Sequence, residues 1–242
     1  MTAITRSRWH QYVMGEHGPF PGCTALCGMQ DATQGSDGLI TWGVNGALDT
    51  YERVLRESKD WEQARADAAK WPARARDLGT DVHTAVDQFN RGLPLEITGE
   101  TAPYVAQYAA WLRNNNVEVL GSEKYVINTA IGFGGTYDSL LRIDGELALC
   151  DVKTGKEKIS QRLQLTGLSM AEWHGEPGEE PEPMPKVDVA YILLLRPDSA
   201  PELIRHEITD ADREHFKYLV DTYHRVRGWA AQFTPTALKE VA

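Results

Sequence analysis

The sequence predicts an α/β fold, a mixed central β-sheet flanked by helices, with helical additions at both ends of the chain. Three observations predict it. Helical spacing of apolar side chains dominates from about Ser58 to Asn114, strand-like alternation takes over from Val117, and another helical segment follows that stretch. With 242 residues, 42% of them apolar, the chain is long enough to bury a sizeable core. We therefore expect a single domain over residues 1–242, with its core at about residues 75–210.

The first half of the chain is expected to be largely helical. Residues 1–50 are rich in Gly, Thr and Ser and lack sustained periodicity, which predicts short strands or turns and a helical start near Trp42. Helical spacing from Ser58 to Asn90 is broken at Trp71-Pro72, and because proline removes a backbone donor this predicts two consecutive helices. A further helix is expected from Pro103 to Asn114. Its aromatic face predicts core rather than a base-stacking platform and consists of Tyr104, Tyr108, Trp111 and Leu112.

The second half alternates strands and helices. Strand patterns occupy residues 117–130, 134–143 and 146–154, and Asp144-Gly145 predicts a two-residue hairpin turn between the last two. The elements expected after them are a helix from Ile159 to Trp173, a flexible acidic loop at 175–186, strands at 187–195 and 202–208, and a helix from its cap Asp210 to Phe233.

The predicted hairpin brings acidic side chains together. The register of a two-residue turn, carried outward along both strands, makes Asp138 face Asp151. Like charges that face each other across a ladder repel, so a shared divalent cation explains this arrangement better than a structural role does. Side chains alternate along a strand, and Lys153 therefore lies on the same face as the two acids.

Two hard oxygen ligands beside an ammonium group suit the hydrolysis of phosphodiester bonds. Mg²⁺ or Mn²⁺ would polarise the phosphate and activate a water, while Lys153 orients that water or stabilises developing negative charge. The backbone carbonyl of Val152 would add a ligand. The alternative is a chance Asp-x-Lys triplet where a strand leaves the core, but the register with Asp138 favours the metal site.

The charge of the chain limits how it would hold nucleic acid. A net charge of −10 argues against binding by bulk electrostatics, so a nucleic-acid enzyme of this composition must concentrate its cations locally. One such concentration follows the hairpin and consists of Lys153, Lys156, Lys158 and Arg162. Considered alone, such a run is more often an ordinary solvated surface.

Cysteine content and hydropathy indicate the compartment. Three cysteines, Cys23, Cys27 and Cys150, are an odd number without CxxC spacing, which predicts reduced thiols rather than disulfides or a zinc site. The N-terminus lacks the apolar segment of a signal peptide, and the longest apolar run, Val189 to Leu195, is short. We therefore expect a cytoplasmic protein that does not bind a membrane.

Five positions, in order, carry a resemblance to a known family. His83 in GTDVH, Asp138 in GGTYD, Asp151 and Lys153 in DVKTG, and Gln164 in QL together resemble the RecB-type branch of the PD-(D/E)xK nucleases. That branch includes phage exonucleases and CRISPR-adaptation nucleases. The resemblance covers roughly residues 75–170, and PGCTAL at 21–26 is similar to a short N-terminal segment of phage members.

The resemblance implies a fold and roles for these residues. It implies a restriction-endonuclease-like core in which His83 binds one metal, Asp138 and Asp151 bind one or two metals, Lys153 is catalytic and Gln164 supports the site. Leu168 stands where the family often has a tyrosine, which leaves open whether that helix contacts DNA or supports the lysine. Members with an iron-sulfur cluster use four cysteines, and with three here we expect no such cluster.

The function implied is a Mg²⁺- or Mn²⁺-dependent nuclease, most simply an exonuclease on linear DNA in phage recombination, repair or replication, with a partner protein from that process. A structure-selective endonuclease and a non-catalytic DNA-binding module are the alternatives, and oligomeric state is left open.

Two residues keep a second interpretation. His83 alone resembles an ordinary helix histidine until its place ahead of the hairpin is considered, and Glu123 is either an accessory acid near the metals or a solvent-facing strand residue.

Overall fold

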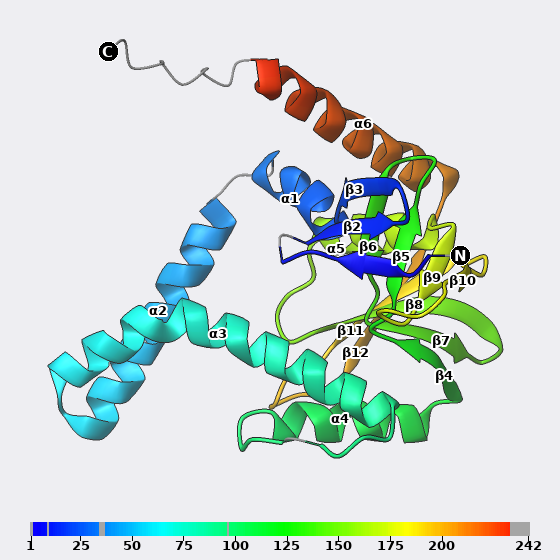
Figure 1. Ribbon diagram of the computed structural model, residues 1–242. Coiled ribbons are helices and arrows are strands. Elements are labelled where there is room, and N and C mark those ends of the chain that lie inside the picture. The colour runs from blue at the N-terminus through cyan, green and yellow to red at the C-terminus, as the bar shows by residue number, and fades with distance from the viewer. Residues whose placement is uncertain (1, 9, 34–36, 96, 233–242) are drawn as a thin grey trace, which may run out of the picture.

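The computed structural model describes residues 2–8, 10–33, 37–95 and 97–232 (Figure 1). Its helices are α1 (Cys23–Thr33), α2 (Asp37–Ser58), α3 (Trp61–Asn90), α4 (Ala102–Asn114), α5 (Ile159–Ser169) and α6 (Asp210–Gln232). Its strands are β1 (Ile4–Arg6), β2 (Gln11–Met14), β3 (His17–Pro21), β4 (Val117–Ser122), β5 (Tyr125–Asn128), β6 (Phe133–Thr136), β7 (Ser139–Ile143), β8 (Glu146–Lys153), β9 (Trp173–Gly175), β10 (Glu182–Pro183), β11 (Val189–Leu194) and β12 (Glu202–Glu207).

A five-stranded mixed sheet forms the centre of the fold, in the order β12-β11-β8-β7-β4. β8 and β11 run parallel, and the other neighbouring strands are antiparallel. Every residue of β11 is buried, as expected for an apolar strand covered on both faces. The predicted α/β class with a mixed central sheet is therefore confirmed.

Helices cover both faces of this sheet. One face packs against α3 and α4 through Val82, Val86, Tyr108 and Trp111, so the aromatic stripe of α4 belongs to the core as predicted. The other face packs against α1, α5 and α6. Along β8 the side chains of Ala148, Cys150 and Val152 enter the first core, while Leu147 and Leu149 contact the second. By this alternation Asp151 and Lys153 lie on the α5 face of the sheet.

Two predicted strand segments are each divided between two sheets. Residues 117–130 form β4 in the central sheet and then β5 in a second sheet of order β10-β9-β5-β6, while residues 134–143 form β6 and then β7. The chain changes sheets at Glu123, which has a φ of 50°, and at Tyr137-Asp138. We call these two places the switch points. They are adjacent, because the backbone N–H of Glu123 donates to the carbonyl of Asp138 at 3.1 Å.

The N-terminal strands form a third sheet, β1-β2-β3, beside the second. A bridge between Gly22 and Gly134 joins them, and the ring of Tyr12 packs on Gly134 so closely that a Cβ there would lie 2.4 Å from it. The predicted short strands of residues 1–50 are therefore present. The helical start expected near Trp42 occurs earlier, at Asp37, and α1 precedes it.

The break expected at Trp71-Pro72 is wrong, because α3 continues through Pro72 from Trp61 to Asn90. A proline inside a helix costs about 3 kcal/mol, so packing must offset it. α2 and α3 pack along each other as a hairpin that projects from the body (Figure 1). The Trp71 ring lies over Gly46 of α2, where a Cβ would be 2.2 Å from it. Tertiary contact therefore preserves the helix at the proline.

The region after the hairpin differs from expectation at three points. α5 ends at Ser169 rather than Trp173, which begins β9. The segment 175–186, expected to be a loop, contains β10, whose Glu182 and Pro183 pair with β9. At the start of α6, Thr209 is the capping residue instead of Asp210, since its hydroxyl accepts the N–H of Asp212 at 3.2 Å. Phe233, the expected end of this helix, lies outside the described residues.

Candidate metal centre

The hairpin between β7 and β8 has the predicted turn and register. Asp144 and Gly145 have φ values of 50° and 88°, the positive values that a type I′ turn requires. Pairing runs as predicted up to Ser139 and Cys150, and there the ladder ends. Asp138 therefore does not face Asp151 as a ladder pair. Its Oδ2 instead accepts the backbone N–H of Val152 at 2.9 Å.

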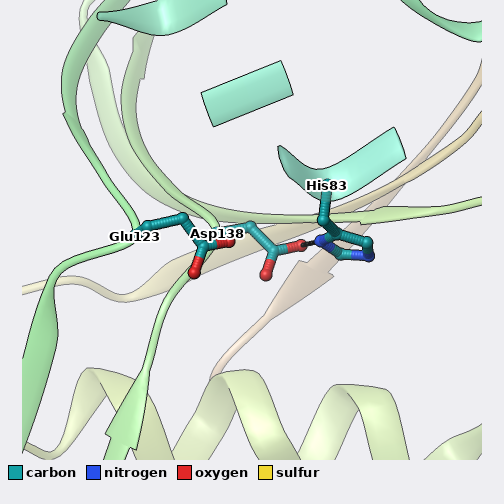
Figure 2. Close-up of side chains that lie close together, drawn as sticks. All are labelled: His83, Glu123 and Asp138. Carbon is teal, nitrogen blue, oxygen red and sulfur yellow. Dashed lines mark ion pairs between the residues drawn. The ribbon is translucent and has the colours of Figure 1, made fainter. Parts of the chain in front are cut away.

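Three potential ligands meet at the switch points (Figure 2). His83 of α3 places Nδ1 3.1 Å from Oδ2 of Asp138. Glu123 lies in the bend between β4 and β5, not in a strand, and its carboxylate points toward Asp138. One ligand atom from each of the three lies within 4.8 Å of the others. Of the two interpretations of Glu123, the geometry favours the accessory acid.

Asp151 forms the other part of the site with Lys153. The Nζ of Lys153 lies 2.7 Å from Oδ1 of Asp151, whose side chain is only 6% exposed. The second oxygen of Asp151, Oδ2, is buried and has no hydrogen-bond partner among the described residues. A buried carboxylate oxygen without a partner is costly, so this atom is a natural position for a cation.

The two aspartates have opposite electrostatic environments. Burial raises the pKa of Asp151 to about 6 despite the neighbouring Lys153. Burial also acts to raise the pKa of Asp138, but His83 and Lys153 outweigh it and hold that pKa below its usual range. Burial and the charge of Asp138 raise the pKa of Glu123 to about 7, and Asp138 raises the pKa of His83. The surroundings of Asp151 and Glu123 thus favour the protonated acid, whereas those of Asp138 favour the carboxylate.

These residues fit a divalent cation. Carboxylate oxygens with one imidazole suit Mg²⁺ or Mn²⁺, and the Oδ2 atom of Asp151 supplies an oxygen that no other group satisfies among the residues described. The gathered set contains two of the predicted ligands, His83 and Asp138, together with Glu123. Asp151, also predicted as a ligand, lies outside this set. Val152 donates its N–H to Oδ2 of Asp138 and buries its side chain, and the role of its carbonyl as a metal ligand stays a prediction.

The remaining predicted residues lie on α5 and the segment before it. Gln164 is half-buried on α5, and within the described residues no hydrogen bond joins it to Asp138, Asp151 or Lys153. Lys156 and Lys158 are exposed, while the guanidinium of Arg162 is 2.6 Å from Glu157. On α5 a different glutamine has a defined contact: Oε1 of Gln161 accepts the N–H of Lys158 at 2.8 Å.

An open pocket of about 390 Å³ adjoins two of the three gathered ligands. His83 and Glu123 line it together with residues that the sequence did not single out, among them Arg6, Thr80 and Tyr125. Thr80 precedes His83 by one helical turn, which is a sequence signal for a shared face. Arg6 and Tyr125 come from strands of the second and third sheets, so no local pattern could have placed them here.

The cysteines and the helices bear on two further expectations. Cys23, Cys27 and Cys150 are buried, and within the described residues none of their sulfur atoms is part of a disulfide. Across the described helices, none combines the length and apolar character that a membrane span requires.

Comparison with known proteins finds matches among solved structures. No protein-family model matches the chain, and no significant match to a curated protein is found. Among solved structures it is similar to an alkaline exonuclease, LHK-Exo, from Laribacter hongkongensis, with a TM-score of 0.36 and 16% identity over 64% of this chain and 86% of that one. For LHK-Exo in complex with dAMP the TM-score is 0.34, at 17% identity and the same coverage. For SSO0001 it is 0.33, at 16% identity over 76% of each chain. Likeness at this level assigns neither family nor activity.

Proposed function

We propose that this chain is a metal-dependent nuclease that hydrolyses phosphodiester bonds of DNA. The observation that supports it is one cluster, in which His83, Glu123 and Asp138 gather within 4.8 Å beside a buried acid and its lysine partner. An unpartnered carboxylate oxygen in that acid, Asp151, favours a cation over a purely structural ion-pair network.

The proposed roles follow from the donor atoms. His83, Asp138 and Asp151 hold the cation, with Glu123 as a further ligand and the carbonyl of Val152 as an additional one. Bound Mg²⁺ or Mn²⁺ would polarise the scissile phosphate and make water a competent nucleophile at neutral pH. Asp151 holds the Lys153 ammonium in place, 2.7 Å away.

Lys153 and Gln164 complete the proposed chemistry. From its position beside Asp151, the Lys153 ammonium orients the attacking water and stabilises negative charge that develops on the phosphate oxygens. Gln164 would support the site from α5, which packs on the same face of the sheet.

DNA would be held by the cations that follow β8. Lys156 and Lys158 are exposed and accessible to phosphates, while Arg162 already pairs with Glu157 and should contribute less. Because the chain carries a net charge of −10, this local concentration must supply much of the attraction. Replacing either lysine with alanine should lower the salt dependence of DNA binding by about one unit of slope.

Within the nuclease class we favour an exonuclease on linear DNA, acting in recombination, repair or replication and encoded by a phage or prophage. This finer proposal rests on the sequence resemblance. A structure-selective endonuclease uses the same core, and a non-catalytic DNA-binding module would be expected to lose an acid or the lysine. Asp138, Asp151 and Lys153 are all retained here, which favours catalysis.

The test uses end-labelled linear DNA and covalently closed circular DNA with Mg²⁺, Mn²⁺ or EDTA. We expect cleavage of linear DNA with either metal and none in EDTA. Release of mononucleotides or short products from an end supports an exonuclease, while cutting of the closed circle supports an endonuclease. Absence of cleavage of any DNA substrate with either metal would contradict the proposal.

A further inference from the structure

The C-terminal end of α3 is attached to both switch points through one amide. Nδ2 of Asn90 donates to the hydroxyl of Ser122 and to that of Ser139, each at 3.3 Å. The phenol of Tyr108 donates to Oδ1 of Asn90 at 2.9 Å. We call these four residues, Asn90, Ser122, Ser139 and Tyr108, the Asn90 clasp. Both amide donors and the acceptor are used, as only an asparagine or glutamine side chain allows.

The two serines of the clasp are the chain neighbours of two proposed ligands. Ser122 precedes Glu123, and Ser139 follows Asp138. The Ser122 hydroxyl also donates to the carbonyl of Asp138 at 3.3 Å, so the two switch points are joined to each other as well. Displacing either serine would therefore displace the adjacent carboxylate.

The third ligand is on the helix that carries the clasp. His83 lies about two helical turns before Asn90 on α3, and a helix of this length is a stiff connection between them. Asn90 consequently fixes the distance between the imidazole and the two carboxylates. The neighbouring Arg91 reinforces this connection, because its guanidinium donates to the carbonyl of Ser122 and pairs with Asp87 at 2.6 Å and Glu176 at 2.9 Å.

We propose that Asn90 is a positioning residue that sets the spacing of His83, Glu123 and Asp138 and thereby determines how tightly the chain binds a divalent cation. The inference rests on the proposed metal site. Asn90 acts on the three ligands indirectly. The hydrogen bonds of its side-chain amide join it to Ser122 and Ser139, and its backbone belongs to α3. Side chains that orient metal ligands in this way commonly contribute about 10–100-fold to metal affinity.

Asn128 provides a matched control. It is buried at 6% exposure, and its amide also joins separate segments, donating to the carbonyl of Met170 at 2.7 Å and accepting the N–H of Ile131 at 2.8 Å. It lies at the far end of β5 from Glu123, away from the clasp. Loss of this amide should lower stability without changing the metal site.

The experiment measures Mn²⁺ binding by calorimetry, together with thermal melts, on EDTA-treated and then chelator-free protein. We expect Asn90→Ala to weaken Mn²⁺ binding by about tenfold or more, and Ser139→Ala to weaken it less and in the same direction. Asn128→Ala should melt at a lower temperature while its Mn²⁺ dissociation constant stays that of the wild type. If Asn90→Ala does not fold, Ser139→Ala carries the test, since removing one hydroxyl leaves the contact of Asn90 to Ser122.

Two results would overturn the inference while leaving the metal site standing. One is wild-type Mn²⁺ affinity in folded Asn90→Ala, or in Ser139→Ala if only that variant folds. The other is an equal loss of affinity in Asn128→Ala, which would make the effect a general consequence of lower stability. A wild-type protein that binds no Mn²⁺ would instead overturn the proposed site, and the role of the clasp with it.

Discussion

The candidate site has two parts that handle negative charge differently. At the switch points, the carboxylate of Asp138 meets His83 at 3.1 Å and the backbone N–H of Val152 at 2.9 Å. At the end of β8, Asp151 has Lys153 on one oxygen and, among the described residues, no partner on the other. The pKa of Asp138 is accordingly below its usual range, while burial raises the pKa of Asp151 to about 6.

The difference indicates what each acid does before and after a cation binds. Asp138 is already stabilised as a carboxylate, so it is a preformed anchor that orients His83 and the end of the hairpin. Asp151 and Glu123 are less favoured as carboxylates in the protein alone, because burial raises both pKa values. A divalent cation should therefore gain most of its binding energy from Asp151 and Glu123 and most of its positioning from Asp138.

The largest expected effect is on cleavage, and it tests the Asp151 part. Lys153→Ala and Asp151→Asn should each lower the turnover of DNA by at least about 10²–10³-fold. Lys153→Ala removes the ammonium group that stabilises the phosphate, and Asp151→Asn removes a charged metal ligand. Initial rates on end-labelled DNA with saturating Mn²⁺ measure this.

Stability must be monitored beside those rates. Lys153→Ala leaves Asp151 buried without its ammonium partner and should itself destabilise the fold. The control is Lys186→Ala, which removes a lysine that pairs with Asp188 at the surface and should keep wild-type turnover. Turnover like that of the wild type in folded Asp151→Asn would contradict the catalytic role of this part.

The second effect concerns metal affinity and tests the switch-point part. His83→Ala should weaken Mn²⁺ binding by about 10–100-fold, as loss of a ligand or its orienting partner does. The affinity of the wild type for Mn²⁺ should also decrease as the pH is lowered. The cation requires a neutral imidazole and ionised carboxylates, and the pKa values of His83, Glu123 and Asp151 are all raised, so protons compete with metal as the pH drops toward and below about 7.

Calorimetric Mn²⁺ titrations between about pH 5.5 and 8.5 check both statements, since this range spans the expected protonation changes. In His83→Ala the pH dependence should be shallower because one competing proton is gone. A variant that binds Mn²⁺ as tightly as the wild type, with the same pH dependence, would make His83 a structural residue.

The sequence predicted the hairpin well because its determinants are local. Asp144-Gly145 accepts the positive φ values of the turn, and the turn then sets the register of every pair up to Ser139 and Cys150. The same local logic fails one step later. Pairing stops where the chain moves from one sheet to the other, and no periodicity in the sequence marks that place.

What the sequence left open or missed depends on contacts between distant segments. Glu123 reaches Asp138 because two strand segments change sheets side by side, and Asn90 reaches Ser122 and Ser139 for the same reason. Such meetings require the tertiary structure. The register predicted repulsion between Asp138 and Asp151. It did not predict which of the two acids would have the raised pKa, because the contact of His83 with Asp138 is visible only in the tertiary structure.

The smallest expected effect separates the two aspartates in the metal-free protein. In EDTA, the raised pKa of Asp151 means that the folded state binds its proton more readily than the unfolded chain, whose ordinary value is 3.8. Its contribution to stability therefore declines as the pH rises from about 4 toward 7. The pKa of Asp138 is lowered, so its carboxylate stabilises the fold at neutral pH and loses that effect only in acid.

Thermal melts in EDTA near pH 5 and near pH 7.5 test this contrast, with Asp151→Asn and Asp138→Asn beside the wild type. Relative to the wild type, Asp151→Asn should gain about 2–4 °C between the lower and the higher pH, which corresponds to about 1 kcal/mol for a domain of this size. Asp138→Asn should melt below the wild type at both pH values, because it loses the charge that pairs with His83. The opposite order, with Asp138→Asn the stabilised variant at neutral pH, would mean that the repulsion falls on Asp138 and that the electrostatic difference between the two parts is reversed.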